Sequence, residues 1–174
     1  ITLTELDDNN LMILKNKFNK NEKIEITNSL TKDLNKKFNT VVYLNVLEHI
    51  EKDILEINNA MEKLNSRGHL IILVPAGSKL YGKFDKAIGH YRRYEMDFFR
   101  NNEFQNAKLI DLYSLDSVGY FLYFVNQLIF KEEVYPSKFK IFIWDKFFTP
   151  ITIFIDYFFR YKFGKNIMCV LRKQ

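Results

Sequence analysis

The chain has a single cysteine, and its first glycine comes late. Cys169 is the one cysteine among 174 residues, which excludes an intramolecular disulfide and a cysteine-based metal cluster and fits a reducing compartment. It falls within an expected strand, where a buried, unreactive thiol is the simplest interpretation. Gly68 is the first glycine. No earlier segment can therefore form a glycine-rich nucleotide-binding loop.

Long apolar runs are also missing. No stretch reaches the ~18 uncharged apolar residues that a membrane-spanning helix needs, and the nearest one, 117–130, contains Asn126 and Gln127. The chain opens on strand-like residues followed by acidic ones, which does not resemble a signal peptide. We therefore expect a cytoplasmic protein. Because the chain starts within a strand and has no initiator Met, we also expect it to be truncated at its N-terminus.

Charge of one sign is only slightly in excess. The 26 Lys and Arg residues outnumber 21 Asp and Glu by five, and the lysines are spread along the chain. That pattern favours a solvated surface over a nucleic-acid interface, so no nucleic-acid partner is expected. Aromatic residues are abundant instead, with 17 Phe and 10 Tyr, and many of them follow residue 117.

Hydrophobic periodicity predicts alternating strands and helices. We expect strands at 1–6, 23–27, 38–44, 69–74, 108–114 and 167–172, and helices at 7–18, 51–64, 95–101, 118–133 and 139–160. Asp7 or Asp8 can cap the first helix, Arg67 and Gly68 suit the end of the helix at 51–64, and Pro150 should bend or break the last one. The apolar run at 38–44 is typical of a strand buried on both faces. This order predicts an α/β fold with a mostly parallel sheet, in one domain spanning residues 1–174.

Polar side chains gather where two expected strands end. The segment 44–50 reads Leu-Asn-Val-Leu-Glu-His-Ile, and the long polar loop at 76–94 ends in Gly-His-Tyr-Arg-Arg-Tyr. Ligands in open α/β sheets bind at the carboxyl ends of strands, and loops of this length inside a domain are usually functional or disordered. The aromatic and arginine content of the loop at 76–94 argues against disorder. The two segments therefore mark the expected site.

Together, these segments resemble a known family. The run Asn45-Val46-Leu47-Glu48-His49-Ile50, the strand after Arg67-Gly68 and the loop at 89–94 look like a class I S-adenosylmethionine-dependent methyltransferase. Within it the chain is similar to the group with a Gly-His-Tyr-Arg-Arg-Tyr loop, which is associated with glycosyltransferases and surface-polysaccharide synthesis. The resemblance implies a Rossmann-like sheet whose last strand is antiparallel. It also implies that residue 1 falls within the second strand, so that the first strand and its glycine-rich loop are missing.

The resemblance implies a set of residues that bind S-adenosylmethionine. Glu5 ends its strand where the family places an acid on the ribose hydroxyls, although an N-cap acid is an alternative. Ser29 and Leu30 occupy the adenine position, where Ser replaces the usual Asp. Leu44 and Asn45 would lie near the sulfonium, and for Asn45 an ordinary strand-end polar role is the alternative.

Two histidines are candidates for the chemistry. Methyl transfer is an in-line displacement that depends mainly on alignment, and an oxygen acceptor must also lose a proton, a task suited to His near neutral pH. His90 lies in the glycine-flanked loop, and His49 stands next to Glu48. Capping or packing is the alternative role for His49. No residues are assigned to a metal.

The loop also supplies the expected acceptor contacts. Guanidinium groups bind phosphate or carboxylate bidentately, which suits an anionic sugar or a lipid-linked acceptor. One arginine could instead pair with Asp85 or Glu95 and fix the loop, and the tyrosines could stack on a sugar or simply pack. The predicted acceptor-binding residues are Asp85, Tyr91, Arg92, Arg93 and Tyr94.

Residues 117–162 form an aromatic-rich helical insertion with interleaved lysines. It could pack into the core, cover the acceptor pocket, form a dimer interface, or lie on the inner face of a membrane as a peripheral contact. Three functions therefore remain open. The chain is a methyltransferase, a non-catalytic remnant or partner subunit of one, or a membrane-surface interaction module.

Overall fold

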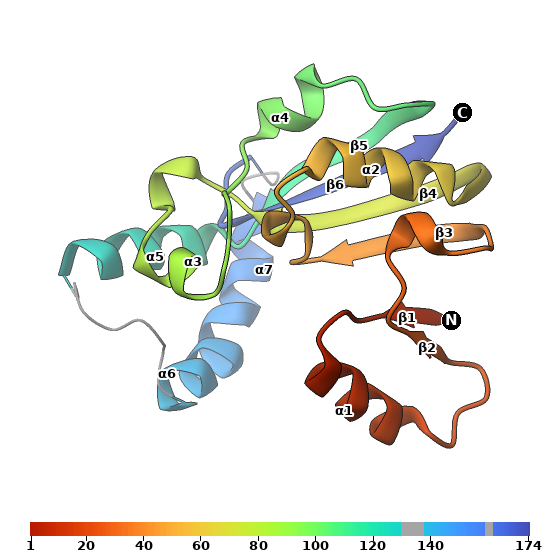
Figure 1. The fold of residues 1–174 in the computed structure, drawn as a ribbon. Coiled ribbons are helices and arrows are strands. Elements are labelled where there is room, and N and C mark those ends of the chain that lie inside the picture. Colours follow the sequence, from red (N-terminus) through yellow and green to blue (C-terminus); the bar gives the residue numbers. More distant parts are fainter. Residues whose placement is uncertain (130–137, 159–161) are drawn as a thin grey trace.

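The computed structural model describes residues 1–129, 138–158 and 162–174. The strands are β1 (Thr2–Thr4), β2 (Glu25–Thr27), β3 (Phe38–Leu44), β4 (Leu64–Pro75), β5 (Ala107–Leu115) and β6 (Asn166–Lys173). The helices are α1 (Asp8–Phe18), α2 (Asp53–Glu62), α3 (Lys83–Ala87), α4 (Met96–Asn101), α5 (Ser117–Ile129), α6 (Lys138–Ile143) and α7 (Thr149–Phe158). Strands and helices alternate over most of this order, so the predicted α/β class is confirmed (Figure 1).

Four strands form the larger sheet, in the order β3-β4-β6-β5. β3 runs parallel to β4, and β6 lies antiparallel between β4 and β5. This matches the expectation of a last strand that inserts antiparallel. The carboxyl ends of β3 and β4 therefore lie at one edge of the sheet, and α3, α5 and α7 gather around that edge (Figure 1).

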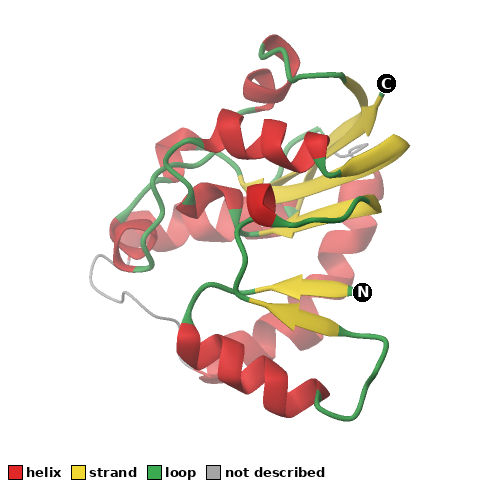
Figure 2. Cartoon of the chain, turned by 45° about the vertical axis from the view of Figure 1, so that its right-hand side comes forward, coloured by secondary structure: helices red, strands yellow, loops and turns green. Residues whose placement is uncertain are grey.

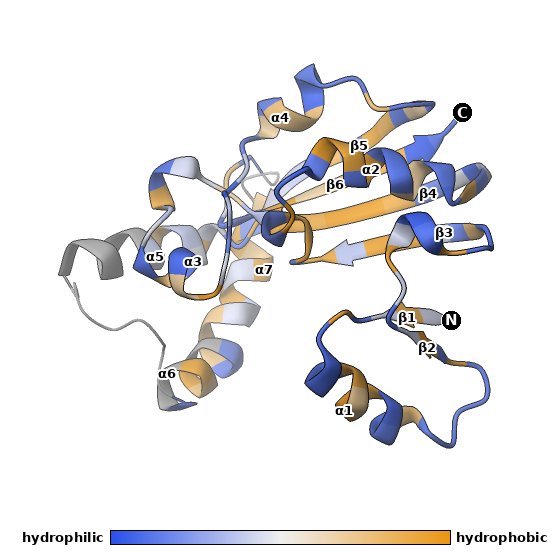
Figure 3. Cartoon of the chain, viewed as in Figure 1, coloured by the Kyte–Doolittle hydropathy of each residue, from blue (hydrophilic) through white to orange (hydrophobic). Residues whose placement is uncertain are grey.

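One hydrophobic core lies against this sheet. On β4, the alternate residues Leu70, Ile72 and Val74 are fully buried, as a strand's two-residue period requires when one face is covered more than the other. They join Ile57 of α2 and Phe99 of α4 in the same cluster. In Figure 3 the hydrophobic colour runs along β4 accordingly. This core fixes the strand ends that carry the polar segments.

β3 differs from its prediction as a strand buried on both faces. Tyr43 points into the core, whereas Val42 and Leu44 are about half exposed. Val42 and Leu44 alternate with Tyr43 and so point to the opposite face of the sheet, which the described residues leave largely uncovered at this strand. A continuous apolar run does not by itself show that both faces of a strand are covered.

β1 and β2 form a separate two-stranded parallel sheet connected through α1. Figure 2 shows these strands beside the larger sheet, with α1 on the side away from it. Among hydrophobic residues 1–30, Leu11 alone is buried, while Leu6 and Met12 are largely exposed. The sequence predicted one sheet, and the structure instead divides the strands into two.

The connection between α2 and β4 also differs from the prediction. The helix ends at Glu62 rather than near Leu64, and Arg67 and Gly68 lie inside β4 instead of capping the helix. A Cβ at Gly68 would lie 2.9 Å from the Asn65 carbonyl oxygen and 3.0 Å from that of Asn39. Glycine is therefore required there by close backbone approach, where β3 and β4 shift register.

Other local predictions are confirmed. Asp7 caps α1, because its Oδ1 accepts the Asn10 N–H at 2.9 Å. The predicted break in the last helix is a π-helical turn at Trp144–Phe148, which places Pro150 in the first turn of α7, where its missing N–H costs no helical bond. Residues 130–133 and 159–160 of the predicted helices lie outside the described residues. Within the described residues, none of the helices has the length and apolar character needed to cross a membrane.

Candidate functional site

The loop at 76–94 folds back onto the carboxyl end of β4. The Tyr94 N–H donates to the Pro75 carbonyl at 2.9 Å, and the Gly77 N–H donates to the Tyr94 carbonyl at 3.0 Å. In the same loop, the Tyr91 N–H donates to the Glu48 carbonyl at 2.8 Å. These backbone bonds bring the two predicted polar segments side by side. The two segments that the sequence marks are therefore adjacent in the fold.

Asp85 is the centre of the buried part of this site. Its Oδ1 accepts from His90 Nδ1 and Arg93 Nε, both at 2.9 Å, and its Oδ2 accepts the Gly82 N–H at 2.9 Å. Burial raises the pKa of Asp85, but these hydrogen bonds and the Arg93 charge outweigh it and hold the pKa below its usual range. Asp85 is therefore an ionised acceptor that orients its neighbours.

Arg93 fixes the loop from inside. Its side chain is almost fully buried, it bonds Asp85, and its guanidinium carbon lies 4.6 Å from the ring centroid of Tyr123 on α5. The predicted alternative of an arginine paired with Asp85 is thus the observed one. Glu95, the other suggested partner, instead accepts from the backbone and hydroxyl of Ser78 at 2.8 Å.

His90 and Glu48 face each other next to the ion pair of Asp85 and Arg93. The bond to Asp85 places the His90 proton on Nδ1, so Nε2 carries the lone pair. That Nε2 lies 3.7 Å from Glu48 Oε1. Burial lowers the pKa of His90 although Asp85 opposes the shift, and burial raises the pKa of Glu48 to about 7. Near neutral pH, Glu48 can therefore gain or lose a proton, whereas burial favours the neutral form of His90.

Glu48 is fully buried and, within the described chain, neither of its carboxylate oxygens has a hydrogen-bond partner. Such an orphaned carboxylate is costly in a folded protein, so it calls for a functional explanation. His49, the next residue, is exposed, and its ring lies edge-on to that of His90 with centroids 4.6 Å apart. Ligand atoms of Glu48, His49 and His90 all lie within 4.8 Å of one another.

Arg92 and Tyr94 belong to a second cluster, built on Asp53. Arg92 Nη1 donates to Asp53 Oδ2 at 2.9 Å, and the Tyr94 hydroxyl lies 3.0 Å from the same oxygen. Tyr94 is buried, whereas Arg92 keeps about a third of its side chain exposed. Tyr91 is 55% exposed. Of the five predicted acceptor contacts, Tyr91 and Arg92 reach the surface, while Asp85, Arg93 and Tyr94 lie inside.

The predicted cofactor residues fall on two sheets. Glu5, Ser29 and Leu30 follow the adjacent strands β1 and β2 at their carboxyl ends, and Leu44 and Asn45 end β3. Glu5 accepts the Asp7 N–H at 2.9 Å through Oε1, and its other oxygen has no partner within the described residues. That oxygen could accept from a ribose hydroxyl, so the Glu5 carboxylate fits the cofactor. Asn45 adopts φ 52°, so the chain turns sharply where β3 ends.

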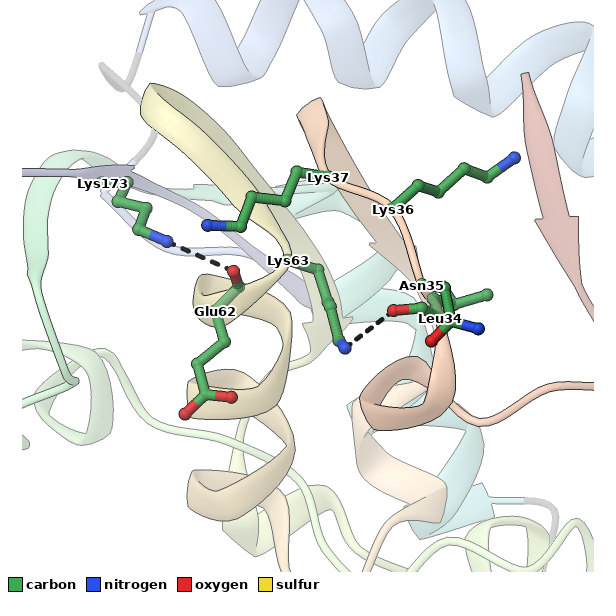
Figure 4. Close-up of a pocket in the computed structure, with 7 residues that line it drawn as sticks. All are labelled: Leu34, Asn35, Lys36, Lys37, Glu62, Lys63 and Lys173. Atoms are coloured by element: carbon green, nitrogen blue, oxygen red, sulfur yellow. Dashed lines mark hydrogen bonds between the residues drawn. The ribbon is translucent and has the colours of Figure 1, made fainter.

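A lysine-lined pocket of about 500 Å³ lies at the opposite edge of the sheet (Figure 4). It sits where β3 and β4 begin and β6 ends. Lys63 donates to the Leu34 carbonyl at 2.8 Å and Lys173 to the Leu64 carbonyl at 2.9 Å. These two lysines therefore stabilise the backbone where strands begin, and the pocket is remote from His49 and His90.

Sequence reasoning missed three contributors. Asp53 lies near the start of the helix predicted at 51–64, Tyr123 comes from an aromatic helix with no motif, and the sequence marks Glu48 only as a neighbour of His49. The adjacent Glu48-His49 pair was a usable signal for a joint role. Nothing in the sequence linked Tyr123 to Arg93, because that contact joins α5 to a loop thirty residues away.

Comparisons with known proteins place the fold. No family model and no curated protein matches the chain. Among solved structures, a protein described as a sarcosine dimethylglycine methyltransferase from Galdieria sulphuraria is similar with a TM-score of 0.62 and 11% identity, over 100% of this chain and 69% of that one. The N-methyltransferase NodS from Bradyrhizobium japonicum, bound to S-adenosylhomocysteine, gives 0.56 and 10%, over 99% and 65%.

A further similar structure is the [4+2]-cyclase SpnF, with a TM-score of 0.61 and 11% identity over 99% of this chain and 65% of that chain. At such identities the likeness shows the fold alone. The chain has a Rossmann-like α/β fold that matches the fold of these methyltransferase structures. The chemistry that this fold performs here must be argued from its site.

Proposed function

We propose that the protein transfers a methyl group from S-adenosylmethionine to a glycan-type or lipid-linked acceptor, as in the group with the Gly-His-Tyr-Arg-Arg-Tyr loop. The observation that carries the proposal is the buried constellation of Glu48, Asp85 and His90. It lies at the carboxyl ends of β3 and β4, in a fold shared with methyltransferases. Ligands in open α/β sheets bind at this edge.

The residues of the chain supply binding and proton handling. Glu5 would hold the ribose, with Ser29 and Leu30 beside the adenine and Leu44 and Asn45 near the methyl-bearing end. The bound cofactor supplies an electrophilic methyl group. His90 is held in one tautomer by Asp85, and its lowered pKa keeps Nε2 free of a proton near neutral pH, so it can accept one from an acceptor hydroxyl.

The acceptor contacts are divided between surface and interior. Tyr91 and Arg92 are exposed enough to touch an acceptor, and Arg92 offers a guanidinium for an anionic group. Asp85, Arg93 and Tyr94 are buried and bonded to their neighbours, so we reassign them to positioning the loop. His49 is exposed next to His90 and faces the same space.

The first experiment is calorimetric titration of S-adenosylhomocysteine into the full chain. We expect saturable binding that Glu5→Ala weakens about tenfold or more, because a carboxylate bound to two hydroxyls contributes more than 1.4 kcal/mol. Asp8→Ala removes the same charge from the exposed first turn of α1 and should leave binding unchanged. Equal binding by the wild type and Glu5→Ala would reject the assignment of the cofactor site.

Acceptor use is tested by transfer of labelled methyl groups from S-adenosylmethionine to glycan and lipid-linked extracts. Arg92→Ala should reduce transfer at least tenfold while leaving S-adenosylhomocysteine binding unchanged. The reverse pattern would reject the loop as the acceptor site. Intact cofactor binding with no transfer to any extract would favour the non-catalytic partner-subunit alternative.

A second role is favoured by the surface of α6, the π-helical turn and α7. Apolar side chains there are between about half and three-quarters exposed, namely Phe142, Phe147, Ile151, Phe154, Tyr157 and Phe158. Lys146 lies within 6 Å of the rings of Phe142 and Phe147. Mixed aromatic and cationic surfaces of this kind bind anionic bilayers. We propose a peripheral membrane contact that would bring the site to a lipid-linked acceptor.

Sedimentation with phosphatidylserine vesicles tests this contact. We expect binding at low salt that falls at high salt and is weak on phosphatidylcholine, because the lysines contribute electrostatically. Phe154→Ser should reduce the bound fraction several-fold, whereas Met12→Ser, an exposed apolar residue on α1, should not. Equal loss in both variants, or no binding to either lipid, would reject the membrane role.

A further inference from the structure

Glu48, His49 and His90 form a cluster that the proposed methyl transfer does not fully use. The protein buries the Glu48 carboxylate completely, yet within the described residues neither oxygen has a hydrogen-bond partner. A buried carboxylate without hydrogen bonds is retained when something else neutralises it. The neutralising partner is either a proton or a cation.

The geometry favours a cation. The 3.7 Å between Glu48 Oε1 and His90 Nε2 is longer than the ~2.7–3.2 Å of a hydrogen bond. Two ligands that each lie about 2.1 Å from one metal ion, at tetrahedral or slightly wider angles, are roughly 3.4–3.6 Å apart. A small adjustment would therefore place both atoms on one ion. A proton shared between Glu48 Oε1 and His90 Nε2 would instead require these two atoms to move closer together, to hydrogen-bond distance.

The orientation of His90 also suits a metal ligand. Asp85 accepts the Nδ1 proton at 2.9 Å and is itself held by Arg93 and the Gly82 N–H. Metal-binding histidines usually donate their second nitrogen to a carboxylate in this way, which fixes the tautomer and raises the basicity of the ligating nitrogen. The Nε2 lone pair is thus presented toward Glu48.

His49 completes the set from the solvent side. Its ligand atom lies within 4.8 Å of those of Glu48 and His90. Gly89, with φ 80°, lies next to this histidine, since a Cβ there would stand 3.9 Å from His49 Nδ1, at ordinary van der Waals distance. Three protein ligands leave at least one coordination position for a water or substrate oxygen. The exposure of His49 places that position toward solvent.

We infer that Glu48, His49 and His90 bind one divalent transition-metal ion, with Zn²⁺ as the representative species. Two imidazole nitrogens and one carboxylate oxygen suit borderline ions, whereas Mg²⁺ and Ca²⁺ prefer oxygen ligands alone. An ion on Nε2 would exclude proton acceptance by that atom. The metal-bound chain therefore could not use His90 as the base of the proposed methyl transfer, and the two proposals are tested by separate measurements.

The test is titration of ZnCl₂ into the metal-free full chain in competition with a chromophoric chelator. We expect one equivalent to bind, with affinity lowered at least tenfold by each of Glu48→Gln, His49→Ala and His90→Ala. His69→Ala is the matched control, because the remaining histidine of the chain lies in the middle of β4, away from its carboxyl end, and should not affect binding. Circular dichroism of each variant verifies the fold, and Glu48→Gln preserves side-chain volume if His90→Ala does not fold.

Co²⁺ gives a second readout, since its visible absorption reports ligand type and geometry. A three-ligand nitrogen and oxygen site should give weak d–d bands that Glu48→Gln shifts or abolishes. Zinc binding of equal affinity in the wild type and Glu48→Gln, more than one weak equivalent insensitive to all three variants, or selective binding of MgCl₂ would each overturn the proposal. Zinc binding without any methyl transfer would leave the site standing and count against the proposed function.

Discussion

The N-terminal unit and the four-stranded sheet contain similar local patterns but very different cores. Residues 1–27 fold as strand, helix and strand, and the one hydrophobic residue buried there is Leu11, at 8% exposure. The larger sheet buries a continuous cluster in which many side chains, including Leu70 and Ile57, have no exposed surface. Secondary structure is therefore similar in both regions, whereas the burial that stabilises it differs.

The difference bears on where the two halves of the proposed site are held. His90, Asp85 and Glu48 rest on the well-packed sheet, while Glu5 and Ser29 rest on the sparsely packed unit. Stability within a protein is not uniform, and regions with few buried apolar contacts open at lower free energy. We expect the acid and histidine cluster to be rigid and the ribose side of the site to be the more easily opened part.

The largest expected contrast is in thiol reactivity. Cys169 on β6 is fully buried, and burial raises the pKa of its thiol to about 12, so labelling by a disulfide reagent needs opening of the core. A cysteine introduced by Thr4→Cys on β1 should react at least about 1,000-fold faster, since the fraction of open molecules limits the buried site. The rates are measured by absorbance. Similar rates for both thiols would contradict the contrast.

Core truncation should separate the regions next. Phe99→Ala removes a ring with 2% exposure from the main cluster and should cost about 3–5 kcal/mol of unfolding free energy. Leu11→Ala in α1 should cost less than about 2 kcal/mol, because few partners surround it. Urea denaturation followed by circular dichroism gives both values. If Leu11→Ala were as costly as Phe99→Ala, the N-terminal unit would be part of the main core.

The paired arginines give a comparison within the loop. Arg93→Met leaves Asp85 buried without its charged partner and should destabilise the protein by about 3–5 kcal/mol. Arg92→Met breaks a partly exposed pair with Asp53 and should cost less than about 1 kcal/mol. Urea denaturation followed by circular dichroism measures the loss of unfolding free energy in both variants. Equal costs would show that burial does not distinguish the two guanidinium groups.

The smallest effect concerns the cap of α1. Asp7→Ala removes the side chain that accepts the Asn10 N–H and should cost about 1 kcal/mol. If the N-terminal unit opens separately, hydrogen exchange will increase in α1 and leave β4 and β6 unchanged. Faster exchange spread evenly over the chain would instead indicate that both regions unfold together.

Much of the fold was predictable from local pattern. The strand at Phe38–Leu44 was placed to the residue, and α1, α4 and β6 within one or two residues, because their periodicity, caps and glycine boundaries act over a few neighbours. The break before α7 was also anticipated from Pro150. The error at Gly68 has the same origin, since a glycine after a helix suggests a cap unless the approach of Asn39 from β3 is known.

The sequence alone determined the α/β alternation, the two polar segments at the strand ends and the buried thiol, because each depends on residues close together in the chain. Tertiary structure decided that β3 is an edge strand, that Arg93 rather than Arg92 is buried against Asp85, and that Glu48 and His90 face each other. Glu48 and His90 lie some forty residues apart, and although Asp85 and Arg93 are close in sequence, Arg93 also packs against Tyr123 of α5. Such contacts form only when the sheet brings its strand ends together, and no local pattern encodes which side chain then lies inside.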